Sequence, residues 1–310
     1  STLKSVVNRG VEVDQLEEIN TDELGVISTK EEAFGLEVWK GTSFSLVEKL
    51  LYRLPFASQS EVMRSLMRRL LLSPARVPKG KIRGEQGEFI KSRINALTRL
   101  GEIASAQSLL RVVPNSAQDH NLVLLDVKLS LLSFNYSRAC LVTVRQFDEV
   151  QDPFLQEVLN FCRIIEGDKD KAALGISLMR ELGNGNEKYF SLIDALISGE
   201  TLSINTLTNL SPLDLAIIKE ARIDLPTSAA NSNEVNVVRA LAEDSQNPVL
   251  LRLNAAERAN NLGIFPTSAL RTMFENVKFS EVELENPLSR AEVRFGPRIR
   301  ALLYLTARSN

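Results

Sequence analysis

The chain has little of what catalytic and metal sites are usually built from. Its 310 residues include one histidine, two cysteines and one tryptophan. A single histidine excludes most Ser-His-Asp triads, and it leaves a metal ion without partners at the usual ligand spacing. The Gly-rich nucleotide-binding motifs, His-Glu-x-x-His and Gly-x-Ser-x-Gly are absent from the sequence. We therefore predict a protein that is not an enzyme, with no catalytic residue, no metal site and no cofactor. For His120, a surface or capping role is favoured.

An excess of one charge and long apolar runs are also lacking. The 37 basic and 39 acidic residues give a net charge of −2, which offers no general attraction to nucleic acid or to an anionic membrane. No apolar run approaches the roughly 18 residues of a membrane span. Aromatic residues make up 6% of the chain and hydrophobic residues 44%, which favours aliphatic helix packing over a β-sandwich. We expect an all-α fold, no membrane span and no nucleic-acid partner.

What the chain does contain is a phrase that returns at positions 101, 134 and 167, a step of 33 residues. Apolar residues recur at helical spacing before each copy. The copies begin with Gly101, Phe134 and Gly167, reach alanine at Ala106, Ala139 and Ala172, and continue with Leu109, Val142 and the pair Leu174 and Ile176. A period of this length predicts stacked helical hairpins, in which the small alanine lets two helices approach closely.

These copies resemble the tetratricopeptide repeat, whose turn and second helix read Gly-Asp-x-x-x-Ala. The stretch from Gly167 and Asp168 to Ala172 fits best, whereas the first copy has Glu102 in place of Asp and the second has Phe134 in place of Gly. The resemblance covers residues 85 to about 183. It implies a right-handed superhelix of helical hairpins, a tetratricopeptide-like α-solenoid, whose first helices form a groove for a peptide or a partner helix.

The whole chain also resembles an uncharacterised family of α-proteobacterial proteins. The phrases that carry this resemblance include residues 38–43, 46–51, 69–74, 255–259 and 296–304. The resemblance implies an exported, cell-envelope protein of helical repeats and transfers no activity and no functional residue. Because the chain begins with Ser1, we expect a trimmed or processed form or a fragment. Its location stays open between periplasm and cytoplasm.

Composition divides the chain into four segments. Residues 1–40 form an acidic arm, and Trp39 is expected to anchor this arm on the first helices. Residues 41–84 form a helical pair with a basic loop. Residues 85–199 carry the tetratricopeptide-like repeats, and residues 200–310 form irregular helical repeats that continue the superhelix. Outside the repeats we expect helices at 45–54, 60–72, 187–197, 212–222, 234–243, 248–262, 266–275 and 297–307, with a linker at 227–233 and with Ser58 or Ser60, Ser211 and Asn247 as caps.

The two cysteines fall on helices that neighbour each other in such an array. Cys140 lies on the second helix of one pair and Cys162 on the first helix of the next. A disulfide is geometrically possible, but two buried free thiols that act as small hydrophobes are favoured.

Two groups of residues are candidates for binding a partner. Lys91, Asn95 and Arg99 recur at a four-residue step on the first repeat helix, so they face either the groove or solvent. The second group, in the basic loop, is Arg76, Lys79, Lys81 and Arg83. This loop either balances the acidic arm, binds a protein or peptide, or binds an anionic polymer; the first is favoured.

The sequence thus favours a non-enzymatic protein–protein interaction scaffold with a protein or peptide partner. The alternatives are an accessory superhelical domain of a peptidoglycan-acting envelope enzyme and an anionic-polymer binding module. The partner and the oligomeric state are not specified by the sequence.

Overall fold

The computed structural model describes residues 20–28, 33–80, 87–114, 119–147, 152–199, 202, 207, 209–293 and 296–309. Every regular element in these ranges is a helix, so the predicted all-α class is confirmed. Two short 3-10 helices are η1 (Thr21–Glu23) and η5 (Thr227–Asn231). The α-helices are α1 (Phe44–Tyr52), α2 (Glu61–Leu72), α3 (Glu88–Arg99), α4 (Ile103–Arg111), α5 (His120–Leu132), α6 (Tyr136–Gln146), α7 (Pro153–Ile165), α8 (Lys169–Glu181), α9 (Glu187–Ser198), α10 (Pro212–Glu220), α11 (Val235–Glu243), α12 (Val249–Asn261), α13 (Thr267–Glu275), α14 (Glu281–Glu285), α15 (Pro287–Val293) and α16 (Pro297–Ser309).

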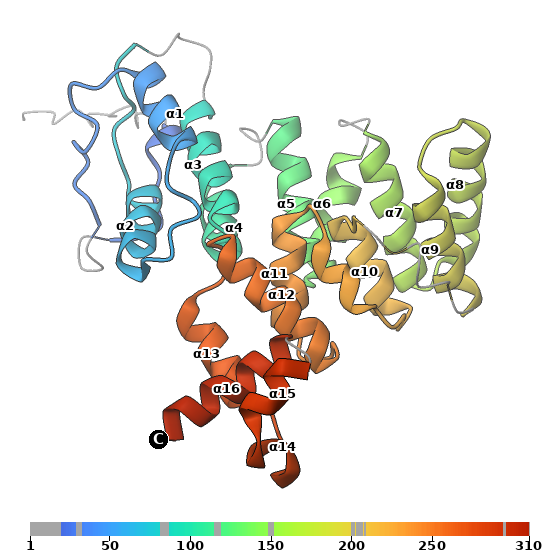
Figure 1. The fold of residues 1–310 in the computed structure, drawn as a ribbon. Helices are drawn as coiled ribbons and strands as arrows, with labels where there is room; N and C mark the ends of the chain where they lie inside the picture. The colour runs from blue at the N-terminus through green and yellow to red at the C-terminus, as the bar shows by residue number, and fades with distance from the viewer. Residues whose placement is uncertain are drawn as a thin grey trace, which may run out of the picture.

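The predicted hairpins are the pairs α3–α4, α5–α6 and α7–α8, which stand side by side in Figure 1. Their turns share one geometry, because Gly101, Phe134 and Gly167 all have positive φ, at 72°, 54° and 88°. The next amide donates to the carbonyl five residues earlier, at 2.9, 2.9 and 2.8 Å in the three turns, as in a Schellman motif. The three alanines of the phrase are fully buried. The 33-residue step is therefore the spacing of identical helix-ending turns.

Phe134 takes the left-handed conformation that glycine takes in the other two turns. This conformation costs a residue with a Cβ about 1 kcal/mol or more. The ring is used in packing: its centroid lies 6.4 Å from that of Tyr136 in an edge-on contact, and the Lys219 Nζ lies 4.1 Å from it. The phenylalanine that departs from the repeat pattern thus connects this turn to α10.

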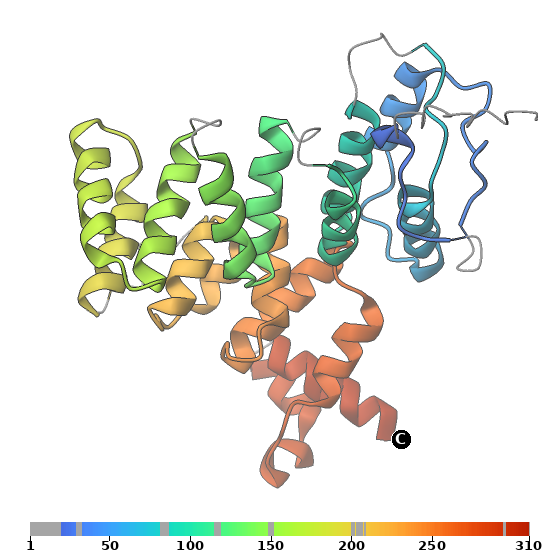
Figure 2. The same cartoon turned by 180° about the vertical axis from the view of Figure 1, so that it is seen from behind.

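After α9 the chain turns back across the row instead of lengthening it. In Figures 1 and 2 α10–α12 lie across the hairpins, and α10 packs on α5 and on α9. Arg239 of α11 donates to the carbonyl of Gly101, and Gly263 lies against the backbone of Ala57. Among the described residues, the chain after α9 thus packs back on earlier helices. The physical reason is that α5 buries residues around its whole circumference, so it needs a cover on both sides.

The helices predicted outside the repeats are present, with two differences in the connections. Ser60 and Ser211 cap α2 and α10 as expected. Asn247 does not cap α12, because its side-chain amide donates to the Leu241 carbonyl at 3.0 Å. The predicted linker 227–233 contains η5, which packs on α12. Its alanines are small enough to be buried there, so this segment is part of the core.

The described part of the acidic arm is anchored by its own carboxylate. Asp22 is 1% exposed, and it accepts hydrogen bonds from the amides of Gly87 (3.1 Å) and Ile90 (2.9 Å) at the start of α3. A carboxylate is well placed there, since the first amides of a helix lack partners and carry partial positive charge. Trp39 meets Phe89 of α3 edge-on, with ring centroids 6.4 Å apart.

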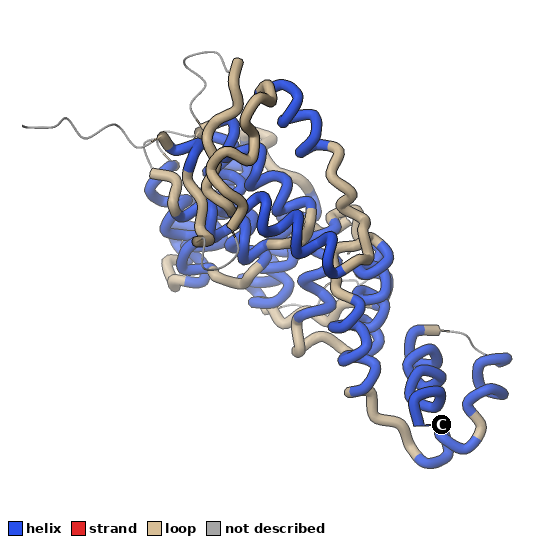
Figure 3. Tube along the Cα trace, turned by 90° about the vertical axis from the view of Figure 1, so that its left-hand side faces the viewer, coloured by secondary structure: helices blue, strands red, loops and turns tan. Residues whose placement is uncertain are grey.

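The C-terminal helices lie to one side of the main body in Figure 3. They have a small core of their own, in which Leu253 of α12 meets Val277 and Ala301. No helix among the described residues is both long and apolar enough to cross a membrane.

Candidate binding surface

The groove beside the first repeat helices is filled by the chain itself. α10 packs on α5 and α9, and its own residues from Pro212 to Ile218 are all buried. Lys188 of α9 pairs with Asp214 of α10 at 2.6 Å and donates to the Asn209 carbonyl at 2.8 Å. Of the first repeat helices, α5 is therefore the one that α10 covers extensively among the described residues.

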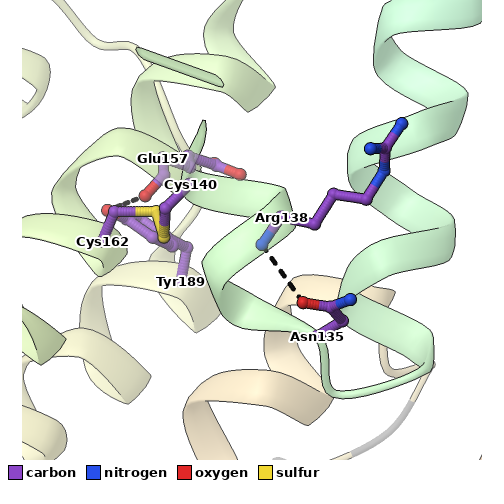
Figure 4. The surroundings of a disulfide bond; sticks show 6 residues. All are labelled: Asn135, Arg138, Cys140, Glu157, Cys162 and Tyr189. Carbon is purple, nitrogen blue, oxygen red and sulfur yellow. Dashed lines mark hydrogen bonds between the residues drawn. A yellow bond between two sulfur atoms is a disulfide. The ribbon is translucent and has the colours of Figure 1, made fainter. Parts of the chain in front are cut away.

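Glu157 of α7 is a partly buried carboxylate that feels the charge of Asp214 on α10. Burial, together with the negative charges of Asp214 and Asp152, raises the pKa of Glu157 to about 7, against the opposing effect of Lys188. The backbone carbonyl of Glu157 accepts a hydrogen bond from the Tyr189 hydroxyl at 3.2 Å (Figure 4).

Figure 4 also shows a disulfide between Cys140 of α6 and Cys162 of α7. The expectation of two free thiols was wrong. The two Cα atoms are 5.6 Å apart, which is within the range that a disulfide bridges. The bond connects the second hairpin to the third, and both cysteines are buried.

The predicted residues of α3 are engaged within the chain. Lys91 pairs with Glu88 at 2.6 Å and with Asp119 at 2.8 Å. Burial lowers its pKa, but the hydrogen bonds with these two carboxylates outweigh that effect, so the pKa of Lys91 is raised. Asp119 is also the N-cap of α5. Lys91 therefore joins the first hairpin to the second.

Asn95 and Arg99 line a cavity of about 260 Å³ between α1 and α3. The Arg99 guanidinium carbon lies 4.7 Å from the ring centroid of Tyr52 and 3.9 Å from that of Phe56. Its Nη1 donates to the Tyr52 carbonyl at 2.9 Å. Arg99 thus holds the end of α1 against α3, and the structure brings Asn95 to it but places Lys91 in a separate contact.

The basic loop is paired with the acidic arm where both are described. Arg76 lies 3.0 Å from a Glu37 carboxylate oxygen, and its amide donates to the Leu36 carbonyl at 2.9 Å. The Lys79 carbonyl accepts from the Phe44 amide at 2.8 Å. Lys81 and Arg83 lie outside the described residues.

A groove that was not predicted from the sequence lies between α7 and α8. It has a volume of about 360 Å³, and its apolar lining comes mainly from leucines of the two helices, from Met179 and from Phe147. Leu174 and Leu178 of α8 and Leu182, its C-cap, are 72%, 53% and 64% exposed. They share one helix face at a four-residue step. Among the described helices, α8 has extensive contacts only with α7, so no other described helix covers this leucine stripe.

Gly175 sets the floor of this groove. A Cβ at this position would lie 2.2 Å from the Asn160 Oδ1 of α7. Asn160 is buried, and its Nδ2 donates to the Met179 Sδ at 3.2 Å. The missing side chain thus lets α8 lie close to α7 beneath the exposed leucines.

The charged residues that line the groove are both cations. Arg163 and Lys171 lie together, because the Arg163 Nη1 donates to the Lys171 carbonyl at 3.3 Å. Lys171 pairs with Asp168 at 2.6 Å. No carboxylate of the described residues lies within 4.0 Å of the Arg163 guanidinium, and none lines the groove.

A signal for this groove was present in the sequence. Ile176, Met179 and Ala172 are buried on one side of α8, while the leucine stripe occupies the other. Of the pair that follows the alanine, only Ile176 enters the core. A helix with two apolar faces is stabilised when a packing partner buries each of them. α7 is the partner for one face of α8.

Within the described residues, no three His, Cys, Asp or Glu side chains are grouped so that they could hold a metal ion. Comparison of the chain with protein-family models, with curated proteins and with solved structures gave no match, so a function has to be inferred from the geometry of the chain itself.

Proposed function

We propose that this protein is a non-enzymatic interaction scaffold of the helical-repeat type that binds a protein or peptide in the groove between α7 and α8. The observation that carries this proposal is the uncovered leucine stripe beside a groove of about 360 Å³. A contiguous exposed apolar patch on a helical scaffold is typical of an interaction site. The groove predicted beside the first helices is a poorer candidate, since α10 fills it.

The three hairpins with identical turns support a right-handed, tetratricopeptide-like superhelix as the framework. In such arrays, each hairpin is covered by the next, and an end with a polar outer face closes the row. The apolar outer face of α8 departs from this rule, which is expected if a partner completes the row.

The disulfide supports an oxidising compartment as the place of action. Disulfides persist in secreted and periplasmic proteins and are rare in the cytosol. This agrees with the export that the α-proteobacterial resemblance implies, and we propose the periplasm as the compartment.

The test is a selection from a library of displayed random peptides on the purified oxidised protein. Peptides selected on the wild type are then measured against Leu174→Gln/Leu178→Gln. We expect at least a tenfold loss of affinity, because two leucines of the stripe become polar. The matched control is Leu284→Gln/Leu288→Gln, since these leucines are exposed to a similar degree, 48% and 72%, on α14 and α15. Equal affinity for both double variants would contradict the proposal.

A further inference from the structure

The charge of the groove indicates which kind of partner it takes. Resting on the proposed function, we infer that the groove binds an acidic amphipathic helix of another protein, with its apolar face on the leucine stripe and a carboxylate on the Arg163 guanidinium.

The apolar part of this inference follows from the spacing of the stripe. Leu174 and Leu182 are two helical turns apart, which corresponds to about 12 Å along α8. A second helix laid along α8 would present apolar side chains at the same interval, at positions i, i+3 or i+4, and i+7.

The carboxylate part follows from the state of Arg163. A guanidinium carries five N–H donors in a planar fork, and the described contact of Arg163 is with one backbone carbonyl, that of Lys171. Lys171 forms an ion pair with Asp168 at 2.6 Å. The charge of Arg163 also acts on the Asp168 carboxylate, but no hydrogen bond joins these two side chains among the described contacts. Arg163 therefore has donors to spare beside an apolar surface. A carboxylate matches this fork with two parallel hydrogen bonds.

The charge of the described lining works in the same direction. A basic peptide would bring its charge next to Arg163 and Lys171, and no carboxylate is among the described residues that line the groove; the nearest described acid, Asp168, is already paired with Lys171. An uncharged apolar peptide would cover the stripe but leave the Arg163 guanidinium without a carboxylate. An acidic amphipathic helix satisfies both features at once.

The same displayed-peptide selection tests this partner class. We expect the peptides that lose binding to Leu174→Gln/Leu178→Gln to share apolar residues at helical spacing and one Asp or Glu at a fixed distance from them. Peptides that depend on the stripe but show no preference for an acid would overturn the partner class and leave the scaffold proposal standing. If no selected peptide depends on the stripe, the scaffold proposal itself fails.

A double-mutant cycle then measures the contact directly, with Arg163→Gln in the protein and Glu→Gln, or Asp→Asn, in the best selected peptide. We expect each single change to weaken binding about tenfold, the size of one charge-assisted contact, and the second change to add little. Arg271→Gln, at an exposed arginine of α13, is the control and should leave affinity within twofold. Additive effects of the two changes would overturn the assignment of the carboxylate to Arg163.

Size-exclusion chromatography with light scattering tests whether a second copy covers the stripe instead. We expect the wild type and Leu174→Gln/Leu178→Gln to have the same monomeric mass at micromolar concentration. A dimer that this double variant dissociates would assign the stripe to self-association and overturn the inference.

Discussion

Arg93 is a fully buried arginine that connects three segments of the chain. Its Nε donates to the Leu71 carbonyl at 2.9 Å, and its two terminal nitrogens donate to the Leu24 and Ser73 carbonyls at 2.7 Å each. Burial lowers the pKa of Arg93 to about 10, although the charge of Asp22 opposes this effect. The side chain therefore remains charged at neutral pH. It holds the acidic arm and the end of α2 on α3.

Replacing Arg93 by Met leaves these buried carbonyls without donors. We expect Arg93→Met to lower the free energy of unfolding by about 3 to 5 kcal/mol. Urea denaturation followed by circular dichroism measures the change, and Arg271→Met provides the control at an exposed arginine. A loss below about 1 kcal/mol would show that the network is not needed to hold the arm.

Glu157 makes stability depend on pH. Its pKa is about 7 in the folded chain and about 4.3 when unfolded, so the folded state binds the proton more tightly. The tighter binding of this proton contributes fully to the free energy of unfolding below about pH 4, and the contribution is lost as the pH rises through 7. We expect Glu157→Gln to gain about 1 to 2 kcal/mol over wild type at pH 8, after allowance for solvent screening.

At pH 4.5 the gain from Glu157→Gln should nearly vanish, because wild-type Glu157 is then protonated. Thermal unfolding of both proteins at the two pH values measures the difference, with Glu181→Gln on the exposed side of α8 as the control. A gain that is the same at both pH values would contradict the raised pKa.

At the scale of elements, the contact of α8 with α7 depends on Gly175. A Gly→Ala change inside a helix usually stabilises it by up to about 1 kcal/mol. Here the new Cβ would overlap Asn160, whose side chain is buried and bonded to Met179. We expect the sign to reverse, with Gly175→Ala losing about 1 to 2 kcal/mol in urea denaturation.

The control for Gly175→Ala is Ser177→Ala, an exposed position on the same helix. It should be neutral or slightly stabilising. If Gly175→Ala stabilises the protein as much as Ser177→Ala does, α8 does not approach α7 as closely as described.

The disulfide joins α6 to α7 across 22 positions of sequence. A loop of this size restricts the unfolded chain enough to stabilise the fold by about 3 kcal/mol. We expect Cys140→Ala/Cys162→Ala to lose about this amount relative to the oxidised protein, and to be little affected by added reductant. Thiol titration of the denatured wild type should find no free thiol. Two titratable thiols would contradict the bond.

The elements that depend on local pattern were predictable from the sequence, and those that depend on distant packing were not. The turns at Gly101 and Gly167 were predictable, because the left-handed conformation that ends a helix favours glycine, and glycine recurs there at a fixed step. No local sequence pattern indicates which helices α10 packs on, since an apolar helix can pack on any apolar face. Arg93 and Asp22 were missed because buried charges look like surface charges until their partners are known.

The binding surface shows the same division between local and distant information. Lys91, Asn95 and Arg99 were selected for their four-residue step, but Lys91 also pairs with Asp119 before α5 and Arg99 donates to Tyr52 of α1, both far along the chain. The leucine stripe of α8 was visible as an excess of apolar residues. Which of its two apolar faces meets α7 is decided by Gly175 and Asn160, one on each helix.

For the whole molecule, the main feature is a row of hairpins covered on one side by its own C-terminal helices. α10 packs on α5 and α9, and Arg239 and Gly263 connect the later helices to the start of the row. This arrangement satisfies the apolar faces of the first repeat helices internally. It leaves the outer face of α8 exposed beside the groove of about 360 Å³.

Hydrogen–deuterium exchange of the oxidised protein, with and without the tightest selected peptide, tests this account most directly. Backbone amides covered by a ligand or stabilised beneath it exchange more slowly. We expect added protection over α7 and α8, at residues 153–182, and unchanged exchange in α5 and α10. Protection of α5 together with faster exchange in α10 would contradict the account, because the peptide would then have displaced α10 from the first-helix groove.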